Sequence, residues 1–147
     1  MKDDLSFAVW LAFNGNCQQV FSYYQACFGG ELTVQTLGDS PHSSGLGKQM
    51  RAYVICATLK NEYFNLMGTD LTDEGRIVAG NNVSILIECK SFTERIRLIN
   101  KLVGRNFCSI NNTNPFINVT DKYSIKWILR VSQFIEPGKE NAVVKAK

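Results

Sequence analysis

The side chains that could carry chemistry in this chain are few, and their spacing points away from a catalytic relay. His42 is the single histidine, and no nucleophile motif surrounds it, so neither a Ser/His/Asp nor a Cys/His arrangement can be assembled from neighbouring motifs. No glycine-rich phosphate loop follows an expected strand and opens a helix. The pattern therefore favours ligand binding, and it does not decide whether the protein is an enzyme.

The cysteines and the charge distribution indicate a cytoplasmic protein. The five cysteines, Cys17, Cys27, Cys56, Cys89 and Cys108, include no CxxC pair, and their odd number suits reduced thiols. The net charge of +3 is spread along the chain, so we expect no nucleic-acid or membrane partner. No apolar run reaches the length of a signal-peptide core with its flanks or of a transmembrane helix.

The candidate ligand pocket comes from three expected strands, residues 62–68, 82–89 and 125–131. Alternation along a strand sends one set of side chains toward a helix and the other set to the opposite face. The opposite-face set is Tyr63, Asn65, Met67, Ser84, Leu86, Glu88, Lys126, Ile128 and Arg130. Mixed apolar and polar walls suit a small molecule, and two cations on one strand favour an anionic one. The alternative is that Lys126 and Arg130 are simply solvated, at the mouth or at a subunit edge.

Two helices are expected to position these strands. Residues 16–28 carry an apolar stripe at helical spacing, with Asn16 and Gln19 placed to form a capping box and Gly29 placed to end the helix. We expect Trp10, in the preceding strand, to lie in the core.

The second helix repeats the design of the first. Residues 92–103 follow a capping box at Ser91 and Glu94 and end at Gly104. Matching positions of the two helices are 75 residues apart, which favours an internal duplication over two unrelated amphipathic helices. Trp127, on the helix side of the last strand, is expected in the core.

The strands around these helices predict an α+β fold made of two βαβββ repeats. The expected strands are residues 5–13, 31–37, 51–59, 62–68, 82–89, 105–110, 116–120 and 125–131. Paired through their strands, the halves at about 5–69 and 82–131 would form one curved eight-stranded mixed sheet with a concave cup and helices outside. We expect one domain over residues 1–136 and a flexible tail over 137–147.

Several of these segments resemble a known family. The run from Asn14 to Cys17, the run from Tyr23 to Glu31 and the run from Gly38 to Pro41 are similar to the PhnB-like branch of the vicinal-oxygen-chelate superfamily. That superfamily also holds glyoxalase I, extradiol dioxygenases and bleomycin-resistance proteins. Residues 82–85 and 121–127 match later segments, and the resemblance extends over residues 5–131.

The resemblance implies where a metal would sit and indicates that none is bound. Metal-dependent relatives place one ligand on each of four strands, and those positions hold Ala8 or Val9, Met67, Ser84 and Ile128 here. None of these side chains is a normal ligand for a divalent cation, so we expect no metal and no cofactor. The family also implies a homodimer. Some relatives carry a ubiquinone-methyltransferase label, which we discount because the expected fold has no doubly wound sheet.

The segment 38–49 is a candidate flap. It is polar and contains Gly45 and Gly47 around Leu46, its one large apolar residue. We expect a mobile flap over the cup with Leu46 against the ligand, the alternative being a connection without a role.

The sequence thus predicts a metal-free, PhnB-like protein that binds an unidentified small molecule in its cup. One alternative is a metal-dependent lyase, isomerase or dioxygenase of the glyoxalase type. Another is a drug-sequestering or purely structural dimer module.

Overall fold

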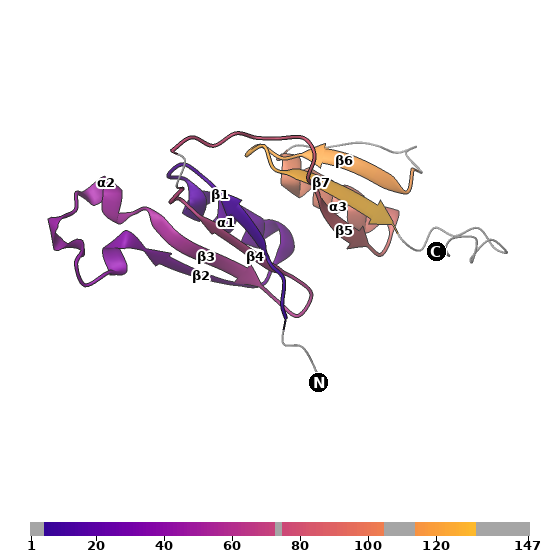
Figure 1. Cartoon of the computed structure of the whole chain (residues 1–147). Helices are drawn as coiled ribbons and strands as arrows, with labels where there is room; N and C mark the ends of the chain where they lie inside the picture. The colour runs from indigo at the N-terminus through magenta and orange to yellow at the C-terminus, as the bar shows by residue number, and fades with distance from the viewer. Residues whose placement is uncertain (1–4, 73–74, 105–113, 132–147) are drawn as a thin grey trace. The chain divides into compact units, whose positions relative to one another are not determined.

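The computed structural model describes residues 5–72, 75–104 and 114–131. The chain divides between Val78 and Ala79 into two compact units (Figure 1). Among the described residues each unit holds one mixed β-sheet and one helix of 12 residues, so the α+β class is confirmed.

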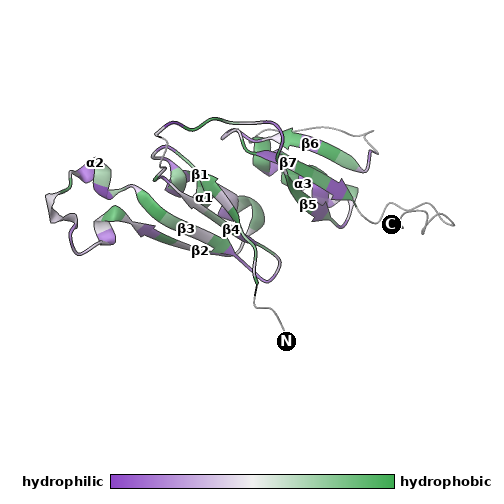
Figure 2. Cartoon of the chain, in the orientation of Figure 1, coloured by the Kyte–Doolittle hydropathy of each residue, from purple (hydrophilic) through white to green (hydrophobic). Residues whose placement is uncertain are grey.

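The first unit contains a four-stranded sheet. Its strands are β1 (Val9–Ala12), β2 (Glu31–Thr36), β3 (Val54–Lys60) and β4 (Asn65–Thr69), and helix α1 (Cys17–Phe28) joins β1 to β2. The strand order is β1-β4-β3-β2, with β1 parallel to β4 and the other pairs antiparallel. Figure 2 shows a hydrophobic stretch along β3 and hydrophilic residues in the turn to β4.

Helix α1 packs on one face of this sheet because its apolar stripe faces the strands. Val20, Phe21 and Tyr24 are fully buried. Gly68 of β4 makes room for Phe21, since a Cβ atom at Gly68 would lie 2.5 Å from Phe21 Cε1. This close approach holds the middle of the helix against the sheet.

The second unit contains a three-stranded sheet within the described residues. Its strands are β5 (Ile85–Cys89), β6 (Phe116–Thr120) and β7 (Lys126–Val131), and helix α3 (Phe92–Val103) follows β5. The order is β5-β7-β6, with β5 parallel to β7 and β6 antiparallel to it. The core lies between α3 and β7, where Ile99, Leu102, Trp127, Leu129 and Val131 are buried.

The expected helix 92–103 has the bounds of α3, and α1 begins one residue later than expected. At α3 the Ser91 half of the expected capping box is confirmed, because its side chain accepts a hydrogen bond of 3.1 Å from the Glu94 N–H, and Gly104 ends the helix with a left-handed φ of 70°. The Glu94 carboxylate pairs with Arg97. The strand 116–120 also has the expected bounds.

The capping box expected at α1 is wrong. Asn16 makes no side-chain capping bond. Instead the Asp70 carboxylate, just after β4, accepts hydrogen bonds from the Gly15 N–H at 2.8 Å and the Cys17 N–H at 2.9 Å. A distant side chain that is fixed by the sheet thus caps the helix, and the local Asn side chain is not used.

The segment between β2 and β3 is more ordered than its composition predicted. It forms the turns Leu37–Asp39 and Ser43–Gly45 and the short helix α2 (Lys48–Arg51), which extend beyond the ends of β2 and β3 (Figure 1). The Asp39 carboxylate accepts the Thr36 N–H at 2.8 Å, and the buried Ser43 hydroxyl donates to the Gly38 carbonyl at 3.1 Å. These hydrogen bonds hold helical turns in a segment expected to be a loop, and its role as a mobile flap stays a prediction.

Two expectations lie outside the described residues: the strand at 105–110 and the tail at 137–147. None of the described helices combines the length and apolar character of a membrane span.

Candidate functional site

The face of the second sheet that points away from α3 collects the candidate residues of the second half. Along β7 the side chains alternate: Trp127 is 3% exposed and Leu129 is fully buried on the α3 side, whereas Lys126, Ile128 and Arg130 are half-buried. The alternation predicted from the sequence therefore holds on this strand. We call the side away from α3 the open face of the second sheet.

The strand register arranges the open face in three cross-strand rows. Successive residues on one face of a strand are about 7 Å apart along it. The first row is Lys126 and Thr120; the second is Leu86, Ile128 and Asn118; the third is Glu88, Arg130 and Phe116. Ser84 lies just before β5 and is exposed.

The third row is electrically balanced. The Arg130 guanidinium forms an ion pair with the Glu88 carboxylate, and both side chains are about two-fifths exposed. The same guanidinium lies 5.8 Å from the centroid of the Phe116 ring, within the range of a cation–π contact. The charge of Arg130 is therefore balanced by Glu88, although its buried Nε–H has no hydrogen-bond partner among the described residues.

The first row carries a cation of a different kind. The Lys126 ammonium donates to the Thr120 hydroxyl at 3.3 Å, and among the described residues no carboxylate lies within ion-pair distance of it. An ammonium group has three donors, so two remain for a ligand or for water.

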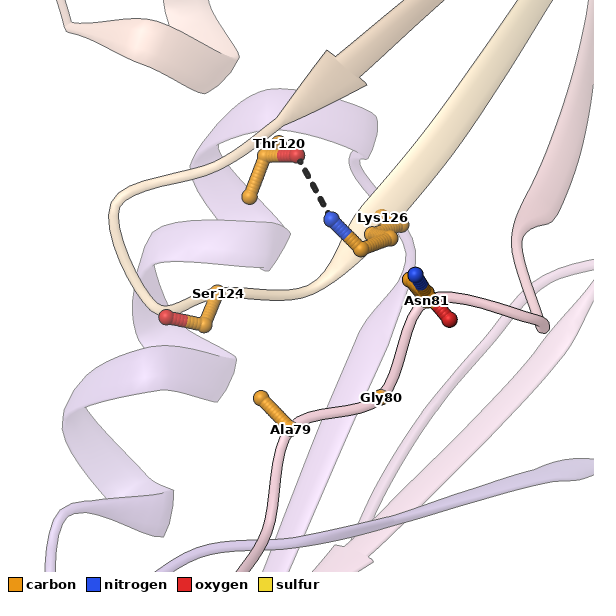
Figure 3. Close-up of a pocket in the computed structure, with 6 residues that line it drawn as sticks. All are labelled: Ala79, Gly80, Asn81, Thr120, Ser124 and Lys126. Carbon is orange, nitrogen blue, oxygen red and sulfur yellow. Dashed lines mark hydrogen bonds between the residues drawn. The ribbon is translucent and has the colours of Figure 1, made fainter.

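A pocket adjoins Lys126 (Figure 3). It is a shallow depression of about 490 Å³ that is largely open to solvent. The lining residues are Ala79, Gly80, Asn81, Thr120, Ser124 and Lys126. They belong to the segment before β5, to the adjoining ends of β6 and β7, and to the turn between these strands. All of them lie in the second unit.

Asp121 holds the turn that supplies the pocket's hydroxyl groups. Its buried carboxylate accepts the Tyr123 N–H at 2.8 Å and the Ile125 N–H at 3.1 Å, and the Trp127 indole N–H donates to it at 2.8 Å. Ser124 is the non-glycine residue of positive φ, 71°, in the described chain. The turn geometry is thus fixed from the core side.

Asn81, Thr120 and Ser124 line the pocket without having been predicted from the sequence. The sequence pattern over residues 120–124 indicates only a turn. The available signal was a hydroxyl residue at each end of a turn that leads directly into Lys126.

The candidates of the first half lie on the other sheet. Asn65 and Met67 are half-buried on β4, on the side away from α1, while Tyr63 is 84% exposed in the turn before β4. Trp10 is next to Met67 in the β1–β4 register and is 56% exposed, so its expected place in the core is wrong. The alternation that begins at Val9, which pairs with buried Leu66, sends Trp10 to the face away from α1.

This register also settles the ambiguous position on the first strand. Val9 shares the α1 side with Leu66, so Ala8 is the residue in phase with the side away from α1. Leu46, the expected flap residue, is half-buried beside the turn Ser43–Gly45.

The family's metal positions do not fit a metal here. Met67, Ile128 and Ala8 offer no ligand atom that suits a hard or borderline divalent cation. His42 is exposed in the segment between β2 and β3. Across the described ranges, no group of three His, Cys, Asp or Glu side chains is placed to hold a metal ion.

Two buried thiols are held in their protonated form. Burial, with the nearby Asp70 carboxylate and Cys56, raises the pKa of Cys17 to about 12. Burial also raises the pKa of Cys89, with Arg95 acting in the opposite direction. Neither thiol is therefore suited to act as a nucleophile near neutral pH.

Solved structures share this architecture. Protein PA1353 from Pseudomonas aeruginosa is 27% identical, with a TM-score of 0.70, over 87% of this chain and 98% of that chain. A Bacillus cereus PhnB protein, described as a putative 3-demethylubiquinone-9 3-methyltransferase, is 19% identical, with a TM-score of 0.61, over 86% of this chain and 99% of that chain. A gene product from Arabidopsis thaliana is 17% identical, with a TM-score of 0.53, over 86% and 98% of the two chains.

No protein-family model and no curated protein matches the chain. The structural matches span nearly the full length of both PA1353 and the PhnB protein. They show a shared fold, which is consistent with the resemblance to the PhnB-like branch of the vicinal-oxygen-chelate superfamily that the sequence indicates.

Proposed function

We propose that this protein binds a small organic anion on the open face of its second sheet, with Lys126 as the anchoring cation and without a metal ion. The observation that carries the proposal is the setting of Lys126: it lines the pocket, shares a hydrogen bond with Thr120 and has no carboxylate partner among the described residues.

The remaining pocket groups support an anion because they can donate hydrogen bonds. Asn81 contributes an amide and Thr120 a hydroxyl group near the ammonium of Lys126, and Ser124 adds a second hydroxyl residue to the lining (Figure 3). Hydrogen bonds to a charged group contribute more than neutral ones, about 1.5–3 kcal/mol each. One cation with several neutral donors therefore favours an anion over a neutral ligand, with moderate affinity.

We propose further that the two units form the halves of one eight-stranded cup. Each described sheet has its first strand parallel to, and next to, its last strand, and α1 and α3 begin 75 residues apart. In that arrangement Tyr63, Asn65 and Met67 would line the same cup as Lys126. Residues 1–136 would then be one domain.

A homodimer in the cytoplasm completes the proposal. The open edges of two small sheets need to be paired or blunted, and two-fold symmetry is the commonest solution. Light scattering at micromolar concentrations would give twice the chain mass. A monomeric mass would remove this part of the proposal.

We do not extend the methyltransferase name of the Bacillus cereus protein to this chain. The described strands form two mixed sheets, and no glycine-rich turn of a dinucleotide-type site follows β1 or β5. A metal-dependent reaction of the glyoxalase type is the other candidate. Elemental analysis with metal titration tests it: stoichiometric Ni, Zn, Mn or Fe that survives dialysis would replace our proposal.

The anion site is tested by titrating the full chain with organic anions while amide signals are followed by NMR. We expect saturable shifts around residues 79–81 and 120–126, weakened at least tenfold in Lys126→Gln. Lys90 directly follows the C-terminal end of β5, whereas Lys126 lies at the start of the parallel strand β7. Lys90→Gln removes the same charge away from the pocket and is the matched control. Equal loss in both variants, or shifts elsewhere, would contradict the proposal.

A further inference from the structure

We infer that the anion bound on the open face is an apolar monocarboxylate, an aliphatic or aromatic acid with a single negative charge, rather than a phosphate ester. This inference rests on the proposed function, because it names the class of anion that Lys126 would hold.

The charges of the open face carry the first step. Of its two cations, Arg130 is neutralised by Glu88, which leaves Lys126 as the uncompensated one among the three rows. A phosphate ester carries close to two negative charges at neutral pH, since its second pKa is about 6. One ammonium balances a carboxylate and leaves a phosphate with about one charge unmatched.

The second row contains the apolar side chains Leu86 and Ile128, which we call the apolar bed and which would contact the rest of the ligand. Leu86 is 47% exposed and pairs in register with half-buried Ile128, one row from Lys126. In the third row Phe116 is 48% exposed. Leu86 and Ile128, adjacent in register, would cover the apolar part of a ligand and be removed from water by it.

The rows set the size of the ligand. With the carboxylate at Lys126, the second row lies about 7 Å away along the strands and the third about 14 Å away. An acid of about six to eight carbons would therefore extend over Leu86 and Ile128 and end short of the third row. Such a molecule matches the polar first row and the apolar pair Leu86 and Ile128 of the second row.

The pocket geometry suits a carboxylate head. The donors near Lys126 are the Thr120 hydroxyl and the Asn81 amide, and Ser124 adds a second hydroxyl residue to the lining. The two carboxylate oxygens can accept hydrogen bonds from the two remaining N–H groups of the ammonium. They can also accept from one or two of these neutral donors. Hydroxyl and amide donors without a second cation fit a single charge.

A series of ligands with one head and a growing body tests the inference. Acetate, butyrate, hexanoate and octanoate are titrated into the full chain, with hexyl phosphate and hexanol as head-group controls. We expect the dissociation constant to fall about two- to fourfold per added methylene, because each is partly removed from water. Hexanoate is expected to bind at least tenfold tighter than hexanol and no weaker than hexyl phosphate.

Leu86→Thr tests the apolar bed separately from the head. Threonine suits an exposed edge strand, so this variant is expected to fold, and a native-like NMR spectrum confirms it. It should reduce the gain per methylene and leave acetate binding unchanged. Val83→Thr, an equally apolar exposed site outside the three rows, should leave the whole series unchanged.

The outcomes separate this inference from the proposed function. If hexyl phosphate binds tighter than hexanoate and still depends on Lys126, the anion site stands and the monocarboxylate inference is overturned. If chain length has no effect while all carboxylates depend on Lys126, the apolar bed is wrong and the anion site stands. If no anion depends on Lys126, both fall.

Discussion

At the residue scale, Asp70 ties the first unit together. Besides capping α1 through Gly15 and Cys17, its second oxygen accepts the Val54 N–H at 2.9 Å, so one buried carboxylate satisfies three backbone donors. These donors begin two elements that are far apart in sequence, α1 and β3. The local sequence around Asn16 gives no sign of this partner, which is why the expected cap was wrong.

Replacing Asp70 by Asn should destabilise the protein strongly. The variant presents an NH₂ group to at least one backbone donor that is already buried, and we expect a loss of about 2–4 kcal/mol in the free energy of unfolding. Urea denaturation measures it. Asp39→Asn alters an exposed carboxylate that accepts one backbone bond, from Thr36, and should cost less than about 1 kcal/mol. Equal effects of the two changes would contradict the role of Asp70.

Cys17 makes stability depend on alkaline pH. Its folded pKa of about 12 lies above the ordinary value of 9.0, so the folded state keeps a proton that the unfolded state releases. This contribution is fully present below pH 9.0 and is lost as pH rises toward 12.

The Cys17→Ala variant isolates this effect. Above pH 9.0 the wild type should lose stability relative to the variant. The slope should be at most about 1.4 kcal/mol per pH unit. Denaturation at several pH values from 7 to 10.5 gives the difference between the two proteins. A difference that does not change with pH would show that this thiol titrates normally.

At the element scale, the two helices have the same length and different N-terminal caps. The hydroxyl of Ser91 caps α3 locally, whereas Asn16 contributes no side-chain bond to α1. Ser91→Ala should therefore cost about 1 kcal/mol, and Asn16→Ala less than half of that. Thermal or urea unfolding of both variants checks the order, and a larger effect at Asn16 would restore the local cap that the sequence predicted.

Helix α1 also depends on a missing side chain in β4. A methyl group at Gly68 would clash with the Phe21 ring, so Gly68→Ala should destabilise by about 1–3 kcal/mol through overpacking. Gly45 has open space at its Cβ position and no positive φ, so Gly45→Ala should be within about 0.5 kcal/mol of the wild type. If the two variants unfold alike, the packing of α1 is looser than described.

Periodicity and glycine positions predicted the elements well, because each depends on residues close in sequence. The bounds of α3 and β6 agreed with expectation, and the alternation of β7 placed Lys126, Ile128 and Arg130 on one face. The register of β1 was ambiguous, and Trp10 was wrongly placed in the core. Its position is set by pairing with β4, a contact that no local pattern reports.

The turns at the candidate site were less predictable than its strands. Asp121 fixes the β6–β7 turn through the Trp127 indole, which is a contact between a turn and the core. The segment from Leu37 to Arg51 is held by side-chain hydrogen bonds that composition does not foretell. A mobile flap over the ligand stays a prediction for this segment. Hydrogen exchange with and without hexanoate would test it.

At the scale of the whole molecule, each unit has one 12-residue helix and one mixed sheet among the described residues, and the two sheets present different side chains on the face away from the helix. The first sheet presents Trp10, Asn65 and Met67 away from its helix, and the second presents the three rows with Lys126 at one end. The polar anchor of the proposed anion site therefore belongs to the second unit.

The central claim is that Lys126 holds the carboxylate of an apolar acid, and a crystal structure with 6-bromohexanoate tests it most directly. The bromine marks the tail by anomalous scattering. We predict a carboxylate oxygen about 2.7–2.9 Å from Lys126 Nζ and the bromine over Leu86 and Ile128. The carboxylate bound at another site, or the three rows covered by a second copy of the chain with no ligand, would contradict it.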